Sequence, residues 1–530
     1  MSFLSQAKTK RFLAVHGWSG TLLGLLLYVV IFTGSVVVFE EEIDAWSQGF
    51  LAHEDGVGRR VDHHFRMAAR GVDRRYYEEV LISRQADGSL RYVFHTHQTD
   101  PDTGRVIEPA VRITLDPNTG EVTERWEGLL AEQPRGPGSA LRDFLVDLHV
   151  QLYLPNPYGL ILVGVLGLMM MAAAISGILI HSHIFRDAFV AARNPARLVG
   201  TRDLHLLAAS WALPFAVILA FTGAFFGFVG TVGVPLVAMS AFGGDRQAMI
   251  ETIVGQREEA DLRPTPLASL DYVILDATKR TGAVVNSIQI TNYDSHGAKI
   301  VLRMEPPEGS LTPQTLGFDG PSRAFEGARP LIGQEPSLGS SLVGLMFPLH
   351  FGNFAGIASK LVWMGMGLAM AFVAASGMLL WTKRREDVPV WRAFQRAVMV
   401  TIWGLPGAML ISAATYFVTH PIADPHFCTP LGFLVGAALM ITLGLRPGPV
   451  QQRLRLLNAA LCISLPVLRH LMGGTSWSEA LIGGGTAIII IDFLLIGAGL
   501  VMLRRPNSAL DEPPPRPARP VLSAVQEPAE

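Results

Sequence analysis

Four histidines stand at repeated positions in the sequence, and their type and spacing suit them to hold metal centres: His16, His149, His205 and His350. The first and third precede a Thr-Gly dipeptide by 17 residues, at 33–34 and 222–223. The second and fourth precede a Ser-Gly dipeptide by 27 and 26 residues, at 176–177 and 376–377. Each histidine comes just before or within the start of a long apolar run. The spacing therefore predicts an internal repeat with one histidine for each of its membrane spans.

The four histidines form two pairs according to their expected depth in a membrane. His16 and His205 begin outward-running spans and are expected at the cytoplasmic edge, whereas His149 and His350 precede inward-running spans and are expected at the outer edge. A pseudo-twofold repeat would bring each pair together across a bundle. Neutral imidazole is a common axial ligand of haem iron, and two imidazoles fill both axial positions for electron transfer. The pattern predicts two haems, one near each face; the alternative is that each histidine only anchors a helix.

Glycines are frequent on the same spans and allow two interpretations. They would let a macrocycle fit between helix backbones, or they would only permit close helix packing. The sequence leaves both open for Gly24, Gly34, Gly164, Gly167, Gly223, Gly227, Gly365, Gly367 and Gly377.

The elements that must position the histidines are membrane helices. Of the 530 residues, 49% are hydrophobic and 17% charged, which is typical of an integral membrane protein surrounded by a lipid bilayer. A helix needs about 20 apolar residues to cross the membrane. The seventh of the candidate runs is the weakest, because it contains Asn458, Pro466 and Arg469. The eight runs lie near 13–39, 159–181, 206–230, 357–381, 397–418, 428–445, 455–471 and 481–503.

Lysine and arginine set the expected orientation, because these residues are retained on the cytoplasmic side. They cluster before the first span and after each even-numbered span, whereas the short connections 419–427 and 472–480 contain none. Both termini are therefore predicted to be cytoplasmic. The long segments 40–158 and 231–356 are predicted to lie outside.

Both outer segments predict small α+β domains. In the first, "DHHFRMAARG" precedes alternating strands and "DPNTG" supplies a hairpin turn; in the second, "LASLDYVILDATKR" precedes similar strands. The expected fold is mainly α, a transmembrane helical bundle of about eight spans with two small outer α+β domains. Its expected units are a first span in 1–39, an outer domain in 40–158, spans two and three in 159–230, a second outer domain in 231–356, a fourth span in 357–381, four additional spans in 397–503 and a disordered cytoplasmic tail in 506–530.

Charge and cysteine content exclude several classes of partner and site. The net charge of −2 gives no global field, so we expect no nucleic-acid partner. Cys428 and Cys462 lie in or beside apolar runs and have no neighbouring cysteine. Neither a disulfide framework nor a cysteine-ligated cluster is therefore expected.

Other ionisable residues give weaker indications. His181 and His183 lie at the cytoplasmic end of the second span, where they are interfacial anchors or replace one member of the inner pair. Asp492 is an intramembrane acid with no obvious partner, for which a proton path is one interpretation. Three further histidines lie at the outer ends of the extra spans, where a structural role is favoured over substrate entry: His420, His426 and His470.

A second group of histidines lies in the first outer domain. His95 and His97 alternate on one predicted strand and so share a face, and His63 and His64 precede them. Solvated polar residues are the favoured interpretation. A weak metal site is the alternative.

Four stretches carry a family resemblance: "RFLAVHGWSGTLLGLLLYVVIFTGSVVVFEEE", "LRDFLVDLHVQLYLPNPYGLILVGVLGLMMMAAAISGILI", "RDLHLLAASWALPFAVILAFTG" and "PLHFGNFAGIASKLVWMGMGLAMAFVAASGMLLW". Together they resemble the PepSY-associated transmembrane helix family over residues 10–385, and "ITLDPNTGEV" is similar to the hairpin of PepSY domains. The resemblance implies two periplasmic PepSY-like domains and a bacterial inner-membrane ferric-siderophore reductase. It also implies two b-type haems at His16, His149, His205 and His350. The chain departs from a four-helix member by its extra spans after 397.

The expected function is a transmembrane electron conduit. A cytoplasmic or quinone donor would supply electrons on one side, and a ferric siderophore would be reduced in the periplasm, which releases iron because hard oxygen ligands favour Fe(III). One alternative is a non-enzymatic scaffold or sensor whose outer domains bind a periplasmic partner. Another is a transporter that uses Asp492 and the last four spans.

Overall fold

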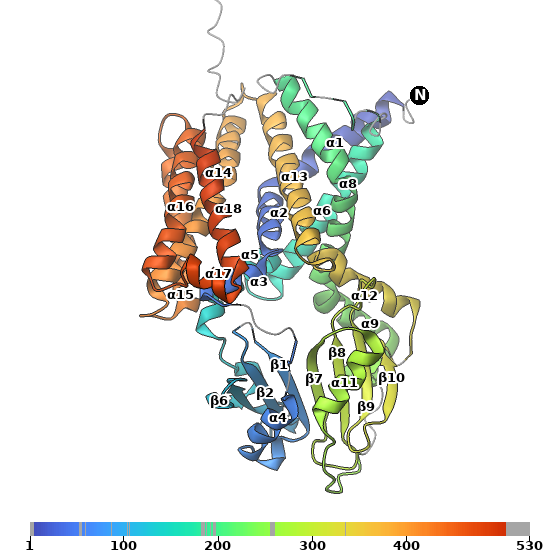
Figure 1. Ribbon diagram of the computed structural model, residues 1–530. Helices are drawn as coiled ribbons and strands as arrows, with labels where there is room; N and C mark the ends of the chain where they lie inside the picture. The colour runs from blue at the N-terminus through green and yellow to red at the C-terminus, as the bar shows by residue number, and fades with distance from the viewer. Residues whose placement is uncertain are drawn as a thin grey trace, which may run out of the picture.

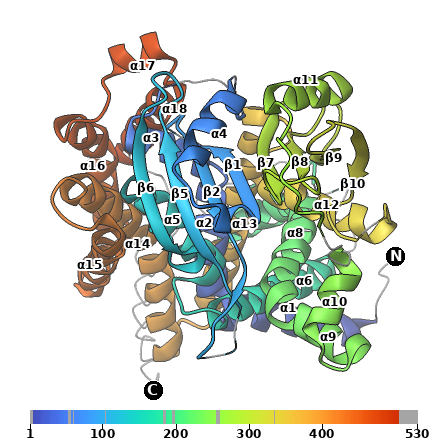
Figure 2. The ribbon, with the colours of Figure 1, turned by 90° about the horizontal axis from the view of Figure 1, so that it is seen from below.

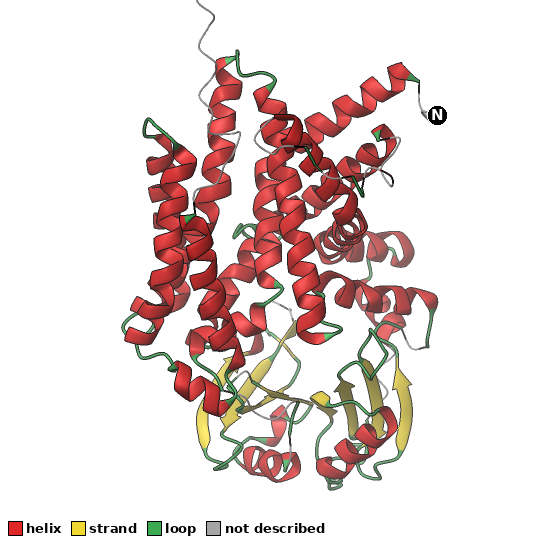
Figure 3. Ribbon diagram, turned by 45° about the horizontal axis from the view of Figure 1, so that its top comes forward, coloured by secondary structure: helices red, strands yellow, loops and turns green. Residues whose placement is uncertain are grey.

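A bundle of long helices stands on a single β-sheet domain (Figures 1 and 3). This arrangement comes from a computed structural model. It describes residues 5–51, 56–58, 60–85, 87–102, 104, 106–181, 186, 188–190, 192–193, 198–254, 260–333 and 335–504. His183 and the predicted tail 506–530 lie outside the described residues.

Seven described helices are long and apolar enough to cross a membrane, and an eighth span results if one bent helix pair is counted. The bent pair is α1 (Gln6–Leu22) and α2 (Gly24–Val37), which meet at 69°. The others are α6 (Tyr158–Ile180), the segment Val199–Phe242, α13 (Gly356–Lys383), α14 (Pro389–Thr419), α15 (Pro425–Leu445), α16 (Val450–Leu471) and α18 (Thr486–Leu503). The prediction of a multi-span helical bundle is confirmed.

Two spans differ in shape from the prediction. The first, expected as one run near 13–39, is broken beside Gly24, where a Cβ would lie 2.7 Å from the Met378 sulfur. Glycine is a common site of sharp helix bends. The third, expected near 206–230, continues from α8 (Leu198–Phe228) through a π-helical turn (Val229–Gly233) into α9 (Val234–Phe242). Its apolar composition does not end at 230, so the helix does not end there either.

Short helices precede α6 and α13, the second and fourth spans of the repeat. Helix α5 (Ala140–Gln151) ends before α6, where Leu152 and Tyr153 adopt left-handed φ values of 53° and 54°. Helix α12 (Leu338–Phe351) ends at Gly352, which has a φ of 67°. The predicted break between His149 and its span is therefore confirmed, and His350 is separated from its span in the same way.

The strands of both outer segments join in one eight-stranded antiparallel sheet with the order β10-β9-β8-β7-β1-β2-β5-β6 (Figure 2). We call the strands of the first segment the first half-sheet and those of the second the second half-sheet. The first half-sheet comprises β1 (Glu79–Arg84), β2 (Leu90–His95), β5 (Pro109–Leu115) and β6 (Val122–Leu129); β3 (Gln98–Thr99) and β4 (Val106–Ile107) form a separate ribbon. The second half-sheet comprises β7 (Val285–Thr291), β8 (Lys299–Met304), β9 (Gln314–Asp319) and β10 (Phe325–Arg329).

Pairing between β1 and β7 merges what the sequence suggested were two separate domains. Val80 lies opposite Ile290 and Ile82 opposite Ile288, and all four side chains are buried in one core. Helices α4 (Val61–Arg70) and α11 (Leu270–Thr281) pack against the same core. An unpaired edge strand exposes a row of backbone donors and acceptors, so pairing two such edges satisfies both.

The extra helices after residue 389 are fixed to the repeat by a buried polar cluster. Arg469 on α16 donates to Asp492 on α18 at 2.8 Å, and the two side chains are 1% and 0% exposed. The indole N–H groups of Trp46 and Trp477 also donate to Asp492, at 2.7 and 2.8 Å. Trp46 belongs to α3 (Glu40–Gln48), and Trp477 to α17 (Trp477–Gly483). The expectation that Asp492 has no obvious partner is therefore wrong, because neighbouring helices bring Arg469 and Trp477 to it and α3 brings Trp46 from the start of the chain.

Candidate functional site

His149 and His350 lie side by side in the last turns of α5 and α12. Their ring centroids are 6.2 Å apart, and the ring planes are inclined by 26°. Imidazole nitrogens bind first-row metals at about 2 Å, so two rings on opposite sides of one metal have centroids about 6 Å apart. We call His149 and His350 the outer pair, after their predicted position. Their spacing fits a single metal centre between the two rings.

A contact to a neighbouring helix holds each ring of the outer pair through Nδ1. His149 Nδ1 lies 3.0 Å from the Val30 carbonyl oxygen on α2. His350 Nδ1 lies 2.9 Å from Thr222 Oγ1 on α8. A histidine ligand is usually oriented by such a bond at the nitrogen that does not bind the metal. The arrangement presents Nε2 as the coordinating nitrogen of both rings.

The other two histidines are held in the same way. His16 Nδ1 lies 3.0 Å from the Ala173 carbonyl oxygen on α6, and His205 Nδ1 lies 3.0 Å from Ser376 Oγ on α13. Helix α1 lies at the end of the bundle remote from the sheet, whereas α5 and α12 lie next to the sheet (Figure 1). His16, on α1, therefore lies toward the end of the bundle opposite His149 and His350.

Hydrogen bonding also fixes which ring nitrogen carries the proton. The carbonyl oxygens of Val30 and Ala173 can only accept, so Nδ1 of His149 and His16 must donate. The hydroxyl of Thr222 already donates to the Ile218 carbonyl oxygen at 2.8 Å, so it accepts from His350. The hydroxyl of Ser376 donates to Phe372 at 2.6 Å and accepts from His205 by the same argument. All four rings are thus the tautomer whose Nε2 has a free lone pair, which is the form that binds metals.

The glycine of each repeated dipeptide lies against one of these rings. A Cβ added to the glycine would meet the ring carbon Cε1 at 2.7 Å for Gly34 and His149, 3.5 Å for Gly177 and His16, 3.4 Å for Gly223 and His350, and 3.3 Å for Gly377 and His205. These glycines therefore make room for an imidazole. From the sequence, Gly34, Gly223 and Gly377 were interpreted as space for a macrocycle or as sites of close helix packing, although the recurrence of the dipeptide with every histidine was a signal of contact with the ring.

Within each repeat, the dipeptide of one span contacts the histidine that belongs to the other span. The first-span dipeptide contacts the histidine that precedes the second span, and the second-span dipeptide contacts the histidine of the first span. Spans three and four repeat the exchange. The same reciprocal contacts therefore recur in both halves of the repeat, as expected of a duplicated membrane unit.

Burial favours the neutral form of the outer pair, which lies on helices outside the candidate spans. Desolvation lowers the pKa of His350 to about 3, with a further contribution from His149. Desolvation also lowers the pKa of His149, against a small opposing effect of its bond to Val30. Both rings therefore stay neutral at physiological pH, as a metal ligand must.

The other predicted candidates lie elsewhere. His426 Nε2 lies 3.1 Å from the Gly136 carbonyl oxygen, and His420 packs on the Tyr416 ring at 5.3 Å. His470 is in the last turn of α16, and His181 caps the end of α6. Cys428 and Cys462 are free cysteines. His63 and His64 are neighbours on α4, with ring centroids 5.6 Å apart.

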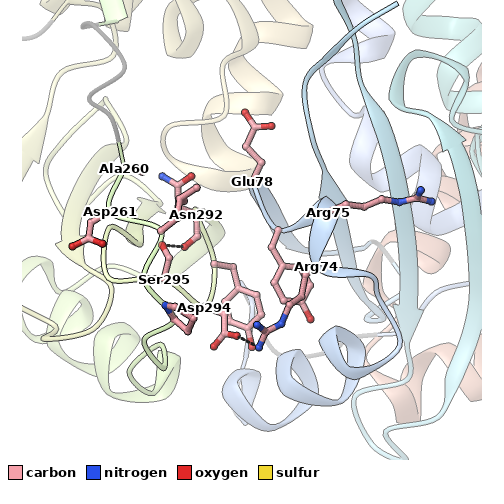
Figure 4. Close-up of a pocket in the computed structure, with 12 residues that line it drawn as sticks. Arg74, Arg75, Glu78, Ala260, Asp261, Asn292, Asp294 and Ser295 are labelled. Carbon is pink, nitrogen blue, oxygen red and sulfur yellow. Dashed lines mark hydrogen bonds and ion pairs between the residues drawn. The ribbon is translucent and has the colours of Figure 1, made fainter.

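A cavity of about 880 Å³ opens where the two half-sheets meet (Figure 4). The first half contributes Arg74, Arg75 and Glu78 to its lining, and the second contributes Asp261 and Asp294 among others. Arg74 bridges the two halves by an ion pair of 2.7 Å with Asp294. The cavity combines cationic and anionic groups and has the size of a small-molecule site.

Comparison with known proteins places this bundle in a family. The model of the PepSY-associated TM region matches residues 13–384, which includes all four histidines and both half-sheets. Uncharacterized protein PA4219 of Pseudomonas aeruginosa is 28% identical over 263 residues. The match covers 47% of this chain and 64% of that relative. Since the family model covers more than half of the chain, the protein belongs to the PepSY-associated TM region family.

Proposed function

We propose that this protein is a transmembrane electron conduit that reduces a ferric siderophore. In this proposal His16 and His205 hold one b-type haem, and His149 and His350 hold a second. Haem supplies one-electron redox chemistry when bound. The observation that carries the proposal is that all four imidazoles are fixed through Nδ1–H and so offer Nε2.

The chain's own residues fit such a group in three ways. The Nδ1 bonds fix the orientation of each ring and increase its basicity as a ligand. The dipeptide glycines keep side chains away from the rings. The 6.2 Å separation of the outer pair matches two ligands of one metal. Simple interfacial anchors need none of these three features.

The charge pattern supports one orientation. Basic residues on the side remote from the sheet favour a cytoplasmic location of both termini, and a bacterial inner-membrane protein with this orientation would have its sheet domain in the periplasm. The outer pair then lies at the end of the bundle that faces the sheet domain. Two redox sites near opposite faces would divide the crossing of a barrier about 30 Å thick into shorter steps.

The cavity between the half-sheets is the docking site that we propose for the ferric siderophore. Its volume of about 880 Å³ suits a compact chelate, and Arg74, which is ion-paired with Asp294, is the cation at the cavity that an oxygen-rich ligand would meet. Reduction weakens the complex because hard oxygen donors hold Fe(III) better than Fe(II). The electron donor would be a cytoplasmic reductant or a quinone.

The first test is optical. We expect the detergent-solubilised protein to be red, with two haems per chain in a reduced-minus-oxidised difference spectrum. His149→Ala and His16→Ala should each remove one haem, whereas the matched control His470→Ala should keep both. A colourless protein, or variants with the wild-type haem content, would contradict the proposal.

The second test measures the reaction. Proteoliposomes with an enclosed reductant and an external ferric siderophore should form Fe(II), detected with an Fe(II)-specific chromogenic chelator. His350→Ala should abolish this signal. Two haems without ferric reduction would restrict the proposal to electron transfer. A colourless protein that binds a periplasmic protein would favour a scaffold or sensor.

A further inference from the structure

We propose that Glu79, His95 and His97 form a binding site for a divalent first-row transition-metal ion on the sheet domain. Each residue offers one ligand atom, and the three atoms lie within 4.8 Å of one another. The site is separate from the four histidines of the bundle. It does not depend on the function proposed for them.

Strand register brings the three side chains together. Glu79 at the start of β1 pairs directly with His95 at the end of β2, and His97 follows two residues later. Residues two apart on an extended segment point to the same face. The rings of His95 and His97 are accordingly 5.5 Å apart, and His95 Nε2 lies 3.7 Å from Glu79 Oε1.

The environment of the His95 ring is the observation that indicates a bound ligand. The His95 side chain is only 5% exposed, and neither ring nitrogen has a hydrogen-bond partner among the residues that the structure describes. The 3.7 Å to Glu79 is too long for a hydrogen bond. Buried polar groups are nearly always satisfied, because leaving one unpaired costs about 1–3 kcal/mol. A metal ion between His95 and Glu79 would supply the missing partner.

Neighbouring groups orient the other two ligands as outer-sphere partners do. Glu78 Oε1 lies 3.0 Å from His97 Nδ1, which leaves Nε2 for the metal. Gln289 on β7 donates to Glu79 Oε1 at 2.7 Å. Glu108 Oε1 lies 3.3 Å from His97 Nε2, so a second carboxylate borders the site. Ligands held in this way bind more tightly than free ones.

The donor set selects the class of ion. Two imidazoles and one carboxylate suit Zn²⁺, Fe²⁺ or Co²⁺, whereas Mg²⁺ and Ca²⁺ prefer oxygen ligands throughout. Ligand atoms around one such ion lie about 3–3.5 Å apart, so closure needs a small movement. Glu79 and His97 are 17% and 29% exposed and have the room to move.

Co²⁺ titration of the full-length protein tests the site, because bound Co²⁺ has visible absorption bands that report imidazole ligation. After treatment with a chelator, the wild-type protein should bind Co²⁺, and Zn²⁺ should displace it. His97→Gln and Glu79→Gln should each weaken binding by at least about tenfold, and Glu78→Gln by a similar factor through orientation. The control His63→Gln, an exposed histidine outside the cluster, should bind as the wild type does.

Two experimental results would contradict the proposed metal site. One is Co²⁺ binding in His97→Gln and Glu79→Gln that equals the wild type. The other is competition by Mg²⁺ as strong as that by Zn²⁺. Thermal unfolding of each variant without metal shows whether it is folded, and the half-exposed His97 is the position at which substitution disturbs the core least.

Discussion

The two parts of the helical bundle bury polar side chains in opposite ways. In the last four spans, Asp492 receives hydrogen bonds from Arg469, Trp46 and Trp477, and both of its oxygens accept. In the repeat, each of the four histidines makes its bond through Nδ1 and keeps a lone pair at Nε2. If the histidines bind haem as proposed, the comparison distinguishes two kinds of polar group in a membrane protein. Hydrogen bonds within the chain satisfy the Asp492 carboxylate, whereas they orient the histidines and leave Nε2 to a ligand.

The largest effect is expected from disrupting the buried hydrogen-bonded cluster around Asp492. Asp492→Ala leaves the Arg469 guanidinium buried without its counter-charge, which should lower the free energy of unfolding by about 3–5 kcal/mol. The double variant Asp492→Ala/Arg469→Met should recover much of that loss. Denaturant unfolding in detergent measures both. A stable Asp492→Ala protein that has lost proton flux would instead revive the transport hypothesis.

Adding a methyl group beside the His149 ring should have the next largest effect. A Cβ at Gly34 would lie 2.7 Å from the His149 ring, whereas one at Gly177 would lie at an ordinary 3.5 Å from His16. Gly34→Ala should therefore displace His149 at a cost of about 1–3 kcal/mol and reduce the haem content, whereas Gly177→Ala should not. Haem stoichiometry compares the two. Equal behaviour would mean that the glycines serve only helix packing.

Removing a hydroxyl that orients a ring should have a smaller effect. Thr222→Val and Ser376→Ala delete the acceptors of His350 and His205. We expect haem affinity to fall by about tenfold or more in each. Transfer of haem to an apo-globin acceptor measures the affinity, and Ser376→Thr, which keeps a hydroxyl, is the matched control. Unchanged haem affinity would show that packing alone orients the rings.

The smallest effect is expected from substituting Thr33, which occupies the same position in the first repeat as Thr222 does in the second. Thr33 donates only to the Val29 and Val30 carbonyl oxygens of its own helix, and His149 is held by Val30 itself. Thr33→Val should therefore change stability by less than about 1 kcal/mol and leave the haem content intact. If Thr33→Val and Thr222→Val behave alike in haem transfer, the hydroxyl contacts do not distinguish the two positions.

Much of the bundle was predictable because span length and hydropathy are local properties of the chain. The repeat and the grouping of histidines by depth followed from spacing and from the direction of each span. The break after His149 was predictable from Pro155 and Pro157. The bend at Gly24 was not, because it depends on the close approach of Met378. The continuation beyond Gly230 was missed, although the apolar composition persists through the π-helical turn into α9.

The amino-acid sequence was enough to predict the number of membrane helices to within one, the repeat and the histidines near its helix ends, since hydropathy and residue spacing can be read along the chain. The folded structure was needed to show which atoms hold those histidines, that β1 and β7 join the half-sheets, and that Arg469 neutralises Asp492. It also decided that Glu79 meets His95 and His97. These contacts join residues far apart in the sequence, and no local periodicity records which strand edge or helix face will meet another.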